Sequence, residues 1–103
     1  MSASNHNRLT LEACLVEKSS LHTNLTGCPM IEVVLQHQSE QSEAGSPRQT
    51  QFEIVAVAMG GAAVAVNACT VGHHYKVQGF LNRKSLKSVK LRLHITHISP
   101  VSH

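Results

Sequence analysis

Strict alternation of apolar and polar residues near the C-terminal end is the feature that most constrains the fold of this chain. The alternating run consists of Val89, Lys90, Leu91, Arg92, Leu93, His94, Ile95 and Thr96. A period of two is typical of a strand with one buried and one solvated face, so we expect the four apolar members to be buried. Residues 75–81 predict a partner strand, and residues 82–88 predict the loop of a hairpin between the two.

The solvated side of this predicted hairpin is cationic. Its basic residues are Arg83, Lys84, Lys87, Lys90 and Arg92. Long cationic side chains on a loop can move to meet a flexible polyanion, and those on a strand hold charge on a rigid surface. A single strand of nucleic acid is therefore a candidate ligand. A solubilising edge that prevents pairing with other strands is the alternative.

Charge is divided unevenly along the 103 residues. The net charge is +3, but all six acidic residues precede residue 54, whereas residues 54–103 hold six of the nine lysines and arginines. The second half of the chain is therefore suited to negatively charged partners.

Composition predicts a single cytoplasmic domain. Three cysteines without a Cys-x-x-Cys pair indicate neither a disulfide framework nor a zinc knuckle. The polar first residues lack the apolar segment of a signal peptide, and the apolar run 54–66 is too short to cross a membrane. We expect residues 1–103 to form one domain, with residues 1–6 flexible and no membrane association.

Three further strands and a helix are predicted before the hairpin. The strands are expected at residues 8–17, 30–37 and 51–59, where apolar residues alternate or β-branched residues dominate. Residues 18–29 and 38–50 are polar and predict loops, the second of them long and mobile. Residues 62–69, rich in alanine and valine, predict a short helical segment.

This all-β order, five strands with a short helix between the third and the fourth, is that of an OB-fold barrel. An SH3-like or other small barrel has similar strands. In OB-folds, the face of strands two and three and the loops after strands one and four bind oligonucleotides. The basic loop at 82–88 takes the second of these loop positions, which favours a nucleic-acid binder.

Seven short motifs follow one another between residues 7 and 98. They are Asn7-Arg8-Leu9, Gly27-Cys28-Pro29, Val34-Leu35-Gln36-His37, Glu43-Ala44-Gly45, Arg48-Gln49, Val71-Gly72 and Val77-Gln78-Gly79-Phe80. In this order and spacing they resemble the primosomal replication protein N (PriB) family, relatives of the bacterial single-stranded-DNA-binding proteins. The resemblance implies an OB-fold homodimer that binds single-stranded DNA. It also implies that the protein stimulates the primosomal helicase, alongside other primosome proteins, during replication restart.

The resemblance also implies which residues contact DNA. Basic residues of the loop between strands four and five correspond to Arg83, Lys84, Lys87 and Lys90. Three family contacts are replaced: an aromatic residue by Gln51, a basic residue by Gln38 and a first-loop lysine by His22. The full predicted DNA-binding set is Arg83, Lys84, Lys87, Lys90, Arg92, Arg48, His22 and Gln51.

Two features of this set leave alternatives open. Arg48 either contacts DNA or pairs with Glu40 or Glu43. The chain has no tryptophan and only three aromatic residues of the Phe, Tyr and Trp types, of which Phe80 is at least as suited to the core as to a base. We therefore expect weak base stacking and strongly salt-dependent binding.

Other functions receive less support. Adjacent His73 and His74 point to opposite faces of a strand, as do His94 and His97 if their strand is regular, so no metal cofactor is expected. No catalytic motif is present and aspartate is absent, so we do not expect an enzyme. An OB-fold adaptor that binds only proteins remains the alternative to a DNA binder.

Overall fold

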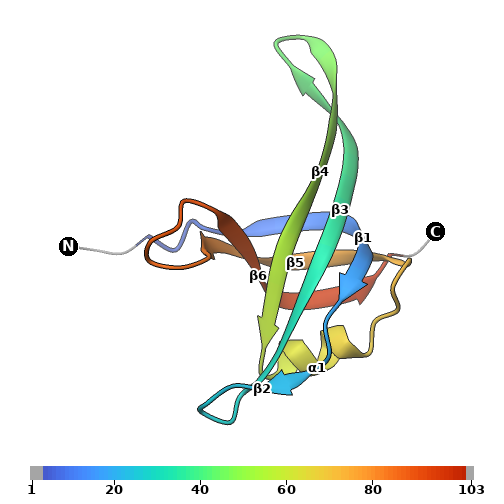
Figure 1. Cartoon of the computed structure of the whole chain (residues 1–103). Coiled ribbons are helices and arrows are strands. Elements are labelled where there is room, and N and C mark those ends of the chain that lie inside the picture. The colour runs from blue at the N-terminus through green and yellow to red at the C-terminus, as the bar shows by residue number, and fades with distance from the viewer. Residues whose placement is uncertain (1–3, 102–103) are drawn as a thin grey trace.

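The computed structural model describes residues 4–101 (Figure 1). The elements are β1 (Leu9–Lys18), β2 (His22–Thr23), β3 (Pro29–Glu43), β4 (Ser46–Met59), α1 (Gly61–Asn67), β5 (His74–Arg83) and β6 (Leu91–Pro100). All five predicted strands and the short helix are present in the predicted order. The two-residue strand β2 lies inside the segment 18–29 that was predicted to be a loop.

The strands close into a barrel because β1 pairs on both sides. Residues 9–14 of β1 pair with β5, and residues 14–18 pair with β3, with a register shift between Leu15 and Glu17 inside that second pairing. The remaining order is β5-β6-β4-β3, in which β6 runs parallel to β4 and all other pairs are antiparallel. Residues 9–13 of β1 therefore keep one edge without a partner strand within the chain.

The core follows from the period-two patterns of the strands. Alternate residues of β1, β3, β4, β5 and β6 form one buried cluster that also includes Ala63 and Val66 of α1. Lys18 attaches the helix to the barrel, since its Nζ donates to the carbonyls of Asn67 and Cys69, each over 2.8 Å. A cation at this position satisfies carbonyls at the helix C-terminal end that have no partner within the helix.

Residues 38–50 are not the mobile loop that their polarity predicted. The strands β3 and β4 stay paired from Met30 and Met59 to Glu43 and Ser46, and the turn is Ala44-Gly45 alone. Both turn residues have positive φ, 53° and 79°, as a type I′ hairpin turn requires. This paired extension projects from the barrel as a two-stranded ribbon (Figure 1).

Two further expectations concern the flexibility of residues 1–6 and membrane association. Residues 1–3 of the segment expected to be flexible lie outside the described residues, and residues 4–6 have no regular secondary structure. Among residues 4–101, no helix has the length and apolar character needed to span a bilayer.

Candidate nucleic-acid interface

The loop between β5 and β6 is held together at its base by hydrogen bonds. Lys84 N donates to Lys90 O over 2.9 Å, and Ser88 N donates to Ser85 O over 3.2 Å. The amide of Lys90 also donates to Ser88 Oγ over 3.0 Å. These bonds fix where the loop leaves and rejoins the barrel, while every residue from 84 to 90 except Ser88 is exposed.

Four exposed cations, Arg83, Lys84, Lys87 and Lys90, form what we call the basic loop. One of them is partly restrained, because Arg83 Nη1 donates to Leu86 O over 3.3 Å. Within residues 4–101, the single ion pair lies elsewhere, so no carboxylate neutralises the four charges in the described structure. The positive potential of the basic loop is therefore available to an anionic ligand.

Two apolar residues lie among these cations. Leu86 is 85% exposed and Val89 is 95% exposed. The prediction that Val89 and Leu91 are buried is wrong, since Val89 precedes β6 and Leu91, the first residue of that strand, is 53% exposed. The alternation holds from Leu93, which is buried together with Ile95.

Arg92 differs from the cations of the basic loop. Its Nη1 lies 3.7 Å from Glu32 Oε1, and its side chain is 20% exposed. Glu32 is on β3, and its register partner on β4 is Val57, so the arginine reaches across β4 to the carboxylate. Part of its charge is therefore already compensated within the chain.

The other predicted DNA-binding residues do not gather at the basic loop. Arg48 and Gln51 are exposed on the ribbon part of β4, and His22 is exposed on β2. Figure 1 shows the ribbon tip, β2 and the loop between β5 and β6 at three separate ends of the molecule. Neither carboxylate proposed for Arg48 forms an ion pair with it in the described structure, and Glu40 instead accepts from Gln49 Nε2 over 3.4 Å.

Phe80 lies on the outer face of the barrel, so its expected alternative role in the core is excluded. The residue is 37% exposed, and its ring stacks on His94 with a centroid separation of 4.9 Å and an interplanar angle of 10°. The sequence predicts this placement, because alternate residues of a strand point to opposite faces. Val77 faces the core, so Phe80 shares the outer face with Gln78 and Asn82.

A bulge in β6 places two histidines on that same outer face. His94 pairs with Phe80 and His97 pairs with Gln78, so the strand carries one extra residue between Ile95 and His97. The prediction that His94 and His97 face opposite sides assumed a regular strand and does not hold here. Partial burial, together with the nearby Arg92 charge, lowers the pKa of His94 below its ordinary 6.5.

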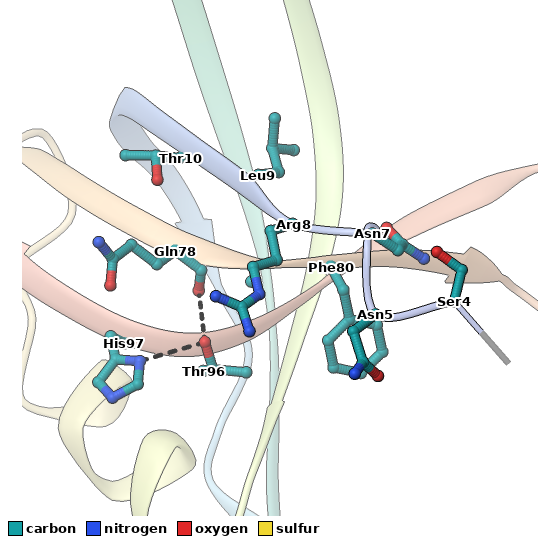
Figure 2. Close-up of a pocket in the computed structure, with 11 residues that line it drawn as sticks. Ser4, Asn5, Asn7, Arg8, Leu9, Thr10, Gln78, Phe80, Thr96 and His97 are labelled. Carbon is teal, nitrogen blue, oxygen red and sulfur yellow. Dashed lines mark hydrogen bonds between the residues drawn. The ribbon is translucent and has the colours of Figure 1, made fainter.

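The bulge borders an open groove of about 730 Å³ between the N-terminal segment and the β5–β6 face. Arg8 extends over this groove toward Thr96, with Phe80 at one end and His97 at the other (Figure 2). The segment is held in place by Asn7, whose Nδ2 donates to Leu81 O over 2.8 Å and whose Oδ1 accepts from Leu81 N over 3.1 Å. Sequence reasoning missed this groove, because its residues come from three separate segments.

Comparison with known proteins connects this geometry to a family. The family model described as "another single-strand binding protein family" matches residues 7–97. The replication restart protein PriB of Bordetella pertussis is 38% identical over 89 residues, which cover 86% of this chain and 83% of the relative. The chain belongs to the PriB family of single-strand binding proteins. The motif-based resemblance is thereby confirmed.

Solved structures of the PriB family confirm the OB-fold. PriB from Ralstonia solanacearum superposes with a TM-score of 0.83 and 32% identity, covering 91% of this chain and 96% of that one. The N-terminal domain of PriB from Thermoanaerobacter tencongensis, described as dimeric, has a TM-score of 0.68 and 17% identity, covering 96% of this chain and 100% of that one.

The structure explains why residue 79, within the PriB-family motif at residues 77–80, is a glycine. Gly79 lies against the bulge of β6 so closely that an added Cβ would be 1.9 Å from the carbonyl oxygen of His94. A glycine at this position therefore lets β5 and β6 approach where the register shifts, and that approach brings Phe80 opposite His94.

Metal binding and thiol chemistry receive no support from the described part of this PriB-family chain. No group of three His, Cys, Asp or Glu residues within residues 4–101 could hold a metal ion. Burial raises the pKa of the Cys69 thiol above its ordinary value, which disfavours the nucleophilic thiolate.

Proposed function

We propose that this protein is a single-stranded-DNA-binding accessory protein of replication restart and binds DNA through the basic loop. The observation that supports this most is the group of four exposed, unneutralised cations at 83–90. The match to a single-strand binding family and the PriB relatives point to the same ligand. The proposal is for a binding protein in the cytoplasm, and not for an enzyme.

The mechanism is electrostatic. Lysine and arginine side chains displace the counterions that condense on DNA phosphates, so affinity falls as salt rises. If each of the four cations meets one phosphate, log K should fall with log salt with a slope of about −2.8, at about −0.7 per phosphate. Such contacts carry no sequence preference, which suits a protein that acts wherever a fork has stopped.

Partners of the protein form the second part of the proposal. We infer that it forms a homodimer through the edge of β1 at residues 9–13, because this edge has no partner strand within the chain and can pair with a second copy. One of its carbonyls, Glu12 O, is already occupied, since it lies 2.6 Å from His37 Nδ1. A dimer would present two basic loops to one DNA strand. In this proposal the bound protein stimulates the primosomal restart helicase and contacts other primosome proteins.

A salt series of fluorescence-anisotropy titrations tests the DNA site. The variant Lys84→Ala/Lys87→Ala/Lys90→Ala should lose affinity, and its slope should shrink from about −2.8 to about −0.7. Lys76→Ala is the matched control, since it removes an exposed cation near the start of β5, outside the predicted DNA-binding set, and should leave the slope unchanged. Equal slopes for the wild type and the triple variant would contradict the proposal.

The exposed Leu86 and Val89 favour one alternative, a loop that docks on a protein and not on DNA. In that case the wild type would show no salt-dependent binding to an oligonucleotide, and helicase binding would be lost in Leu86→Ser/Val89→Ser. The same anisotropy series therefore separates the two functions.

A further inference from the structure

Phe80 is a candidate stacking platform, because one face of its ring is supported and the residue remains partly exposed. His94 stacks against one ring face at 4.9 Å and 10°, and the ring also lines the groove beneath Arg8. Partial burial, with the Arg92 charge nearby, lowers the pKa of His94 and so favours the uncharged imidazole at neutral pH. An aromatic ring held in this way has little conformational freedom left to lose on binding a ligand.

The walls of the groove suit a nucleotide. Amide, hydroxyl and imidazole groups line it, and none of its lining residues is acidic. Its volume of about 730 Å³ lies within the roughly 300–1,000 Å³ of small-molecule sites. Arg8 supplies a cation, and the Asn7 hydrogen bonds to Leu81 hold that cation over the groove (Figure 2).

The groove is also continuous with the basic loop. Phe80 precedes Arg83 by three residues on β5, a separation of about 10 Å at roughly 3.3 Å per residue. In Figure 1 the N-terminal segment and the loop between β5 and β6 lie on the same side of the barrel. A DNA strand bound by the loop can therefore extend onto this face without crossing the barrel.

We propose that the groove takes one nucleotide of the bound single strand, whose base stacks on Phe80 and whose phosphate pairs with Arg8. The inference rests on the proposed DNA-binding function and adds a stacking site to it. Every base has a π face, so the site accepts any base. Stacking on Phe80 also compensates for Gln51, which replaces an aromatic residue of the family.

A matched pair of phenylalanine variants tests the site. Phe80→Leu should weaken binding of an oligo(dT) strand by about fivefold or more, because stacking on an aromatic side chain contributes about that factor per base. Its salt slope should not change, since a base releases no counterions. Phe52→Leu is the control: Phe52 is 39% exposed and also lies beside a histidine, His37 at 5.1 Å, but on β4 next to the base of the ribbon. It should bind like the wild type.

An abasic strand of the same length isolates the contribution of the base. The wild type should prefer oligo(dT) to the abasic strand, and Phe80→Leu should lose much of that preference. Arg8 adds a fifth phosphate contact to the four of the basic loop, so with this site the wild-type slope becomes about −3.5. Arg8→Gln should return it to about −2.8 while keeping the preference. If Phe80→Leu and Phe52→Leu bind alike while the triple lysine variant still loses its slope, the stacking site is wrong and the basic loop stands.

A fluorescent substitution gives a second readout that does not depend on affinity. The chain has no tryptophan, so the indole of a Phe80→Trp variant would be its only one. We expect oligo(dT) to quench its emission and the abasic strand to leave the emission nearly unchanged. Binding of oligo(dT) by anisotropy without quenching would overturn the stacking site, and no binding by the wild type would overturn the proposed function itself.

Discussion

The ion pair between Arg92 and Glu32 predicts that removing a carboxylate creates a new phosphate contact. In Glu32→Gln, Arg92 loses its partner at 3.7 Å but keeps its place beside the end of the basic loop, where its register partner is Asn82. We expect the freed guanidinium to bind a further phosphate, which makes the salt slope steeper.

The magnitude follows from the geometry. The pair is half-buried, with side-chain exposures of 20% and 46%, so it contributes somewhat more than the about 0–1 kcal/mol of exposed pairs. The variant should therefore be about 1–2 kcal/mol less stable than the wild type in urea unfolding. One added phosphate makes the slope steeper by about 0.7, so a fourfold rise in salt should weaken binding of the variant about 2.6-fold more than binding of the wild type.

Three comparisons make this prediction specific in the anisotropy assay. Glu53→Gln removes an exposed carboxylate from the same outer face without freeing an arginine, so its slope should match the wild type. Arg92→Gln alone should also keep the wild-type slope, and Glu32→Gln/Arg92→Gln should return to it. If Arg92→Gln by itself makes the slope shallower by about 0.7, the ion pair does not withhold Arg92 from DNA and the reasoning fails.

Three further predictions concern stability and are measured by urea unfolding. Gly79→Ala should cost about 3 kcal/mol, near the upper end of the overpacking range, because its Cβ meets the carbonyl of His94 at 1.9 Å; Gly61→Ala, with open space around it, should cost little. Lys18→Met should cost about 1–3 kcal/mol through two lost charge-assisted hydrogen bonds at the end of α1. For His94 the folded-state pKa is lowered, so the unfolded state takes up the proton first as pH falls below 6.5. The wild type should therefore lose more stability than His94→Gln as pH falls from 6.5 through the folded-state pKa, and parallel curves would contradict this.

Period-two patterns predicted the fold well where one face of a strand is buried. In β1, Leu11, Ala13 and Leu15 are all buried as their alternation predicts, and the helix follows the third long strand as expected. Alternation fails where the barrel no longer covers the strand. Val89 belongs to the same pattern as Leu93, but it lies beyond the barrel and remains exposed.

The ribbon shows a different limit of sequence reasoning. Its strands are polar on both faces, so residues 38–50 carry no hydrophobic pattern, although β3 and β4 stay in register as far as the turn. The Ala44-Gly45 turn was the available signal, since a glycine in a two-residue turn is compatible with positive φ.

The candidate site was only partly predictable. Consecutive basic residues made the basic loop visible in the sequence, whereas the Arg92–Glu32 pair and the groove under Arg8 depend on which strands become neighbours. The bulge that gives His94 and His97 a common face arises from one extra residue in β6, which alternation alone does not reveal.

The most direct test of the central claim is an NMR titration of ¹⁵N-labelled protein with oligo(dT), which maps the residues whose amide signals shift on binding. We predict shifts concentrated at residues 83–90 and extending to residues 78–80 and 94–97, with the ribbon tip at 40–49 unaffected. Shifts confined to the ribbon or to residues 19–28, with the basic loop unchanged, would contradict the assignment of this surface to single-stranded DNA.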